Sequence, residues 1–193
     1  MAEKKALKGL KSGNLFPVTT NTTTGYVVGT KVALTGLQSL SKTDHVEEYE
    51  IPADDDIYDA GNDYKYTDIE VQVAELDPSI EAALAGGTYE STGGVYTAKS
   101  TDVAPEYALS YAALMTSGGY RLFKHPVLKL MSVTVDHATK GNTNEIASYR
   151  LGFRSFARKI DNVYREQKDV AKDDPITWID TFDTLPTSPP QGG

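Results

Sequence analysis

YALSYAALM at residues 107–115 is followed by TSGG at 116–119 and by YRLF at 120–123. The first string is rich in aromatic and apolar residues, as a strand that packs against a core would be. The second string has the glycine pair of a turn, and the third begins a return strand. Together they predict a β-hairpin.

Four further stretches predict strands. Residues 66–73 alternate apolar and polar side chains, which indicates a half-buried strand with an outward polar face. The polar residues on that face are Asp68, Glu70 and Gln72. Residues 127–135 and 146–157 also predict strands, and residues 31–40 predict a weaker one with a bulge at Gly36.

One short helix is expected after residue 77. Asp77 is a suitable N-cap, Pro78 suits the first helical position, and Gly86 can end the helix in a left-handed cap. The helix is too short to build a layer of its own, so we expect it to flank a sheet. The fold class predicted from these patterns is mainly β with one short α-helix.

The chain is expected to form one domain over residues 1–180. Long loops are expected at 17–30, which is crowded with Thr and Asn, and at 44–63, which is acidic; a further loop is expected at 86–100. The Pro- and Gly-rich residues 181–193 predict a flexible C-terminal tail.

Composition excludes several classes of protein. The 193 residues are 39% hydrophobic and carry 19 Lys and Arg against 27 Asp and Glu, a net charge of −8 that argues against gripping nucleic acid with the whole surface. The absence of Cys excludes disulfides, Cys-ligated zinc and a thiol nucleophile. No apolar run approaches the roughly 18–20 residues of a membrane span, and no secretory signal is visible. We therefore expect an acidic, soluble protein made in a cytoplasm, with no membrane partner.

No motif for catalysis is found. The dinucleotide, P-loop, metalloprotease and nucleophile-elbow patterns are absent, and His45, His125 and His137 have no ligand spacing. A calcium loop beginning at Asp54 would need Gly at its sixth position, where the chain has Asp59. We predict no catalytic residue, no metal site and no cofactor, and interpret the acidic run as a solvated or interface loop.

Charge is divided unevenly along the chain. Residues 44–63 contain nine acids and no Lys or Arg, whereas residues 121–172 contain eleven Lys and Arg against five acids. One interpretation is a solvated acidic loop with an ordinary mixed surface. The other is that the loop of one copy contacts a basic face of the next copy. The residues predicted for that contact are Asp54, Asp55, Asp56, Asp59, Arg150, Arg154 and Arg158.

The order of these features resembles the major tail proteins of siphophages, in particular the phi13-type family. The resemblance covers residues 4–166 and is strongest over 102–158. It rests on Asp102-Val103-Ala104-Pro105 before the hairpin, Lys8-Gly9-Leu10 near the start, Lys140-Gly141-Asn142-Thr143-Asn144-Glu145 at a late turn, and a closing strand that ends in Arg158.

The resemblance implies a β-sandwich or barrel-like tail-tube fold with one flanking helix. It also implies self-assembly into hexameric rings that stack into the tube of a virion tail, a conduit for genome ejection. The partners would be other copies of the chain, the tape-measure protein, the tail terminator and the baseplate proteins, with DNA passing through unbound. Asp68, Glu70 and Gln72 are then candidates to face the lumen.

Three alternatives stay open. A carbohydrate-binding β-sandwich module would use exposed aromatics such as Tyr107, Tyr111 and Tyr120. A hydrolase would use a pair of carboxylates, although nothing in the sequence singles out one pair. Another ring-forming protein, such as a tail terminator or a secretion-system tube, would share most of the expected features.

Overall fold

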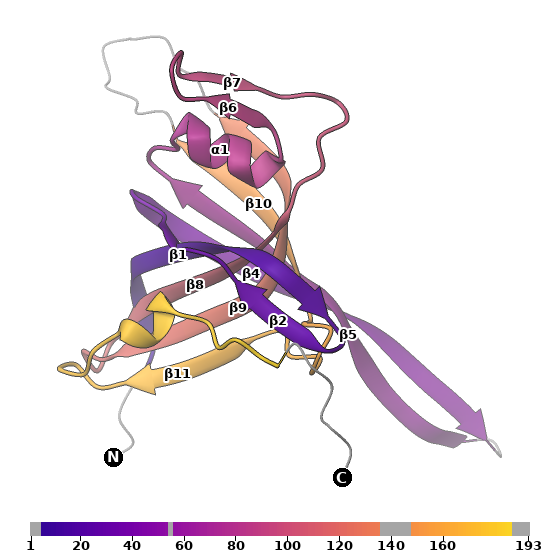
Figure 1. Ribbon diagram of the computed structural model, residues 1–193. Coiled ribbons are helices and arrows are strands. Elements are labelled where there is room, and N and C mark those ends of the chain that lie inside the picture. Colours follow the sequence, from indigo (N-terminus) through magenta and orange to yellow (C-terminus); the bar gives the residue numbers. More distant parts are fainter. Residues whose placement is uncertain (1–4, 54–55, 136–147, 187–193) are drawn as a thin grey trace, which may run out of the picture.

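The computed structural model describes residues 5–53, 56–135 and 148–186, and Figure 1 shows a mainly β molecule with one short α-helix, as predicted. The elements are β1 (Leu7–Thr22), β2 (Gly25–Val28), β3 (Val32–Ala33), β4 (Leu37–Ala53), β5 (Asp56–Val73), α1 (Pro78–Ala85), β6 (Thr88–Glu90), β7 (Val95–Thr97), β8 (Glu106–Met115), β9 (Tyr120–Val135), β10 (Tyr149–Phe156), β11 (Glu166–Val170) and the 3₁₀ helix η1 (Thr177–Asp180).

The main sheet is antiparallel and strongly curved. Its order is β2–β1–β8–β9–β10–β5–β4, with β3 added to β1 and β11 added to β9. Leu15 of β1 and Val71 of β5 lie far apart in this order, yet both are fully buried in one apolar core with Leu109 of β8. The sheet therefore turns back on itself, and Figure 1 shows β4 and β5 crossing behind the layer formed by β1, β8 and β9.

The predicted β8–β9 hairpin is confirmed. Leu114 lies opposite Tyr120 at its closed end, and Gly118 has a φ of 93° in the turn. β8 is buried on both faces, since one face packs in the main core and Ala112 on the other packs against Ile179 of η1. The strand predicted from 146–157 is confirmed as β10 over its described residues.

The chain after η1 corrects the expectation of a flexible tail from residue 181. Phe182 is buried and packs edge-on against Phe16, with ring centroids 5.1 Å apart. The Leu185 amide donates to the Tyr26 carbonyl at 3.0 Å. The sequence did not predict these contacts, because the Pro- and Gly-rich composition of residues 181–193 indicated flexibility and Phe182 and Leu185 are too few to form an apolar pattern. Residues 187–193 lie outside the described residues.

The loops expected at 17–30 and 44–63 are also wrong. The first is the end of β1 with its hairpin partner β2, and the second is the far half of the β4–β5 hairpin. A two-stranded ribbon with both faces in solvent needs no apolar alternation, so its acidic composition resembled that of a loop. The loop expected at 86–100 contains the small β6–β7 hairpin. Gly36 is not a strand bulge but the turn between β3 and β4, with a φ of 65°.

Helix α1 has both of its predicted caps. The Asp77 carboxylate accepts a hydrogen bond from the Ser79 amide at 2.8 Å, and Gly86 ends the helix with a φ of 79°. The Gly87 amide then donates to the Ala82 carbonyl at 2.8 Å. Buried Leu84 joins the helix to the main core, so α1 covers one end of the curved sheet.

Replacing Gly86 by Ala is expected to destabilise the fold by about 2–4 kcal/mol. About 1–2 kcal/mol would come from the left-handed backbone, and the rest from a Cβ that would overlap the Val103 carbonyl. Gly94→Ala is the matched control, because Gly94 has a φ of 66° but open space around it. Urea denaturation of both variants measures the difference, and equal destabilisation would contradict the close approach to Val103.

Candidate functional site

A polar face lies on the side of the sheet opposite the main core. Residues directly opposite one another on neighbouring strands point to the same side. Arg150, Gly152 and Arg154 of β10 lie opposite Gln72, Glu70 and Asp68 of β5, which in turn lie opposite Ser39, Ser41 and Thr43 of β4. These nine residues define the polar face. One surface therefore carries two predicted sets: the residues predicted to line a lumen, and two of the arginines predicted to contact another copy.

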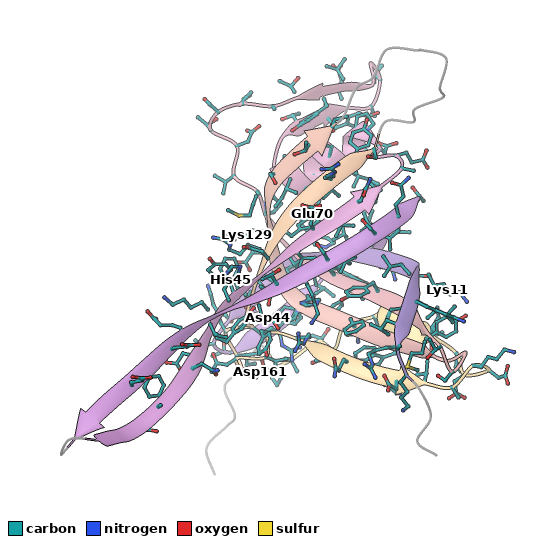
Figure 2. The ribbon with its side chains drawn as sticks, turned by 180° about the vertical axis from the view of Figure 1, so that it is seen from behind. Lys11, Asp44, His45, Glu70, Lys129 and Asp161 are labelled. Atoms are coloured by element: carbon teal, nitrogen blue, oxygen red, sulfur yellow. The ribbon has the colours of Figure 1, made fainter. Side chains whose placement is uncertain are left out.

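A hollow of about 360 Å³ lies in this polar face. Glu70, Ser132 and Gly152 are among its lining residues, and a side chain at Gly152 would overlap the hydroxyl of Ser132 of β9. Glu70 is exposed and projects from the sheet in Figure 2. The polar face thus offers solvent an uncovered carboxylate beside a shallow depression.

Arg154 is held by groups of its own chain. Its Nε donates to Asp68 Oδ1 at 2.9 Å, and its guanidinium lies 3.9 Å from the centroid of the Tyr66 ring. The hydrogen bond that Arg154 donates to Asp68 raises the pKa of Arg154. His45 stacks on the same tyrosine at 4.5 Å and approaches Asp68 Oδ2 at 3.1 Å. The charge of Arg154 is therefore already balanced within the chain.

Arg158 does not share the polar face. An even spacing from Arg150 and Arg154 would put Arg158 on their side of a continuous strand, but β10 ends at Phe156 and the alternation ends with it. Arg158 is only 4% exposed, and its guanidinium donates to Asp161 at 2.8 Å and to Glu166 at 3.0 Å. It acts inside the fold, joining β11 to the end of β10. Arg150 is exposed on the polar face.

The predicted contact acids belong to a projecting arm, defined as residues 46–53 of β4 and 56–64 of β5. Figure 1 shows this two-stranded ribbon extending well beyond the rest of the molecule. Asp59 is exposed on it and Asp56 begins β5, whereas Asp54 and Asp55 lie outside the described residues. The arm also exposes Glu47, Glu48, Glu50 and Asp63. The structure places Asp59 along the ribbon and does not bring it to Arg150, Arg154 or Arg158 of the same chain.

The arm carries apolar surface as well as acids. Val46 is 47% exposed and Tyr49 is 41% exposed. Large apolar side chains in solvent on a ribbon without a core of its own are typical of a surface that contacts a partner.

A cluster of hydrogen bonds and stacked rings, partly buried, holds the base of the arm against the body. Asp44 accepts hydrogen bonds from Thr67 at 2.7 Å and from Arg165 at 3.0 Å, and the Tyr64 ring stacks on Tyr164 at 3.8 Å. Burial alone would raise the pKa of Asp44, but the Thr67 hydrogen bond and the positive charge of Arg165 together hold it below its usual value. Sequence reasoning missed this cluster, since no local pattern relates residues 64–67 to residues 164–165.

His125 lies behind this cluster in the interior. Its side chain is fully buried, and neither ring nitrogen has a hydrogen-bond partner within the described part of the chain. Its ring is parallel to that of Tyr111 at a centroid distance of 6.1 Å. Burial, assisted by the charges of Lys42 and Arg165 and opposed by Asp44, lowers the pKa of His125 to about 3.

Two of the three tyrosines named for a carbohydrate site are inside the protein. Tyr107 is 7% exposed and Tyr111 is 3% exposed, and both belong to the main core. Tyr120 is partly buried, and its hydroxyl accepts a hydrogen bond from Lys11 at 3.2 Å. The prediction that these three residues form an aromatic platform for sugars is therefore wrong.

Neither a metal site nor a spanning helix is found in residues 5–53, 56–135 and 148–186. No three of their His, Asp or Glu side chains gather closely enough to hold an ion, and none of their helices has the length and apolarity to cross a membrane.

Comparison with known proteins gives distant structural resemblances. No protein-family model and no curated protein matches the sequence. Among solved structures, the tube-terminating cap of the anti-feeding prophage is similar, with a TM-score of 0.45 and 9% identity over 88% of this chain and 95% of that chain. A chain of the anti-feeding prophage baseplate has a TM-score of 0.39 and 8% identity over 89% and 99%. Hcp protein has a TM-score of 0.38 and 11% identity over 83% and 100%.

The stability of the wild-type protein is expected to fall as the pH is lowered from about 6.5 toward 3. Because the pKa of His125 in the folded state lies below that of an unfolded histidine, the unfolded chain binds the proton first. The loss can reach about 1.4 kcal/mol per pH unit. Asp169, whose pKa in the folded state is lowered to about 2 chiefly by the hydrogen bond from Arg121, adds to the loss only below about pH 4.5, since the unfolded carboxyl has a pKa of about 3.9.

His125→Leu should remove that slope, and urea denaturation between pH 7 and pH 4.5 measures it. Leu128→Ala is the control, because Leu128 is fully buried on the same strand β9 and its truncation removes core contacts without removing a titratable group, so the slope should stay. A His125→Leu variant with the wild-type slope would show that His125 does not govern acid stability.

Proposed function

We propose that this protein is a structural, non-enzymatic subunit of a phage tail tube of the siphophage phi13-type family, which assembles with its own copies into hexameric rings stacked as a hollow tube. The observation that carries the proposal is the arm, an acidic ribbon that projects from the body and exposes Val46 and Tyr49. Such a ribbon contributes little to an isolated molecule, since both of its faces lie in solvent. Its use is in contacts between copies.

In the proposed tube the polar face lines the lumen. Glu70 is uncovered there, and the positive charge of Arg154 is balanced by Asp68. A wall of this kind holds few free cations for phosphate groups, so DNA would slide past it with little retention. The opposite side of the sheet cannot serve this purpose because it forms the apolar core.

The proposal places the protein in the virion tail after synthesis in the cytoplasm of the bacterial host. Its partners would be its own copies, the tape-measure protein inside the tube, and the tail terminator and baseplate proteins at the two ends. A second candidate of the same class is a ring-forming tube of a secretion system, which the arm and the curved sheet fit equally well. The length and contents of the assembled tube would distinguish the two.

Purified protein at high concentration is expected to form rings or uniform hollow tubes, because the arm needs no ligand to contact another copy. Negative-stain electron microscopy and light scattering on the same sample measure this. A particle that remains monomeric at every concentration would contradict the proposal. If such a monomer also retained a saccharide in a glycan screen, the binding-module class would replace it.

A further inference from the structure

A groove of about 460 Å³ opens between the two ends of the curved sheet. One wall is the start of β1 and the other is the start of β4, while the inner faces of β8 and β9 form the floor. The side chains that give it an apolar lining are Leu7, Leu10, Leu40, Tyr111, Ala113 and Phe123. The sheet does not close along this seam, although Tyr111, Ala113 and Phe123 at its floor are each at most 5% exposed.

Both walls of the groove are free strand edges. Over residues 7–12, β1 pairs with β8 on one side only, and β4 pairs only with β5 along its described length. Amide and carbonyl groups along such edges are ready to bond an added strand. The groove therefore offers an extended segment both backbone partners and apolar surface.

The charge of the groove is positive. Lys8 and Lys42 line it, and within the described chain no carboxylate does so. Lys11 does not line it, because its ammonium donates to the Tyr120 hydroxyl at 3.2 Å and lies over the Tyr120 ring. Residues 5–11 contain three lysines and no acid. An occupant with carboxylates beside apolar side chains would suit this combination.

The arm has that chemistry but cannot reach the groove of its own molecule. Leu40 lines the groove and Tyr49 is on the arm of the same continuous strand. At about 3.3 Å per residue, nine residues of strand separate them by about 30 Å. The arm points away from the body, so any arm that enters the groove comes from a second copy.

We infer that the groove between β1 and β4 receives the acidic arm of a second copy. This inference rests on the proposed function, and it names the surface that one copy offers to the arm of another. Val46 or Tyr49 would enter the apolar part, and Glu48 and Glu50 would lie near Lys8 and Lys42. Glu47 already pairs with Lys65 of its own chain at 2.9 Å. The edge of the arm would pair with the free edge of a wall. The arm would therefore meet this basic surface and not Arg154 and Arg158, the arginines predicted from the sequence. The charges of those two arginines are balanced within their own chain.

Cysteine cross-linking tests the contact without background, because the chain has no native Cys. Tyr49→Cys protein is mixed with Lys8→Cys protein under assembly conditions and then oxidised. A bound arm holds the two thiols at an effective concentration in the millimolar range, so mixed dimers should exceed those of the control pair by at least about tenfold. The control pairs Tyr49→Cys with Thr97→Cys, an exposed position on β7.

Light scattering on the same samples separates the two claims. Assembly without a mixed dimer above the control level would overturn the groove contact and leave the tube proposal standing. No assembly and no cross-link would overturn both. A mixed dimer that forms equally with the full chain and with a chain ending at residue 186 excludes the C-terminal segment as the occupant and supports the arm.

Charge reversal provides a second test that does not depend on cysteine geometry. Lys8→Glu, and separately Glu48→Lys with Glu50→Lys, should each weaken association by about tenfold, because like charges would then meet. Mixing the two reversed proteins should restore it. Glu90→Lys with Lys99→Glu, both exposed and remote from the groove lining, is the control and should have no effect. Failure of the mixture to associate better than either reversed protein alone would overturn the assignment.

Discussion

The pairing of β4 with β5 is the constraint on which the other features depend. The two strands stay paired from Leu37 and Val73 inside the molecule to Ala53 and Asp56 at the far end of the arm. Near the core, one side of the pair buries Ile69 and Val71, while the other side carries the polar face. The free edge of β4 forms a wall of the groove. Beyond the shift of register between His45 and Val46, the same pair leaves the body and becomes the arm. A single long hairpin therefore supplies a core wall, a polar surface, a free strand edge and a projecting ribbon.

The distribution of charge follows from which charges the fold satisfies internally. Arg154 and Arg158 each bond carboxylates of their own chain, so they join neighbouring segments of one molecule. The lysines of β1 beside the groove and the glutamates of the arm lie at opposite ends of the same molecule, where they cannot meet. A negative net charge of −8 also keeps isolated copies apart until a specific contact outweighs the general repulsion. Complementary charges separated in this way favour association between copies.

Local patterns predicted the parts of the fold that depend on local physics. The β8–β9 hairpin follows from a glycine turn between apolar runs, and the caps of α1 follow from Asp77 and Gly86. The lumen-facing set, Asp68, Glu70 and Gln72, was predicted to share a face because strand alternation is local as well. The arm was missed because a ribbon without a buried face has no apolar period to detect. Arg158 was misplaced because alternation stops where a strand ends. The Tyr64–Tyr164 stack and the groove depend on pairing between distant segments, which no local pattern encodes.

The central claim is that copies of this chain build a hollow tube through the arm, with the polar face inward. A cryo-electron microscopy reconstruction of the assembled protein tests it most directly. The account expects stacked six-fold rings, Glu70 facing the channel, and density for the arm of one copy in the groove between β1 and β4 of another. An assembly whose arms extend into solvent, or whose channel is lined by a different face, would contradict it.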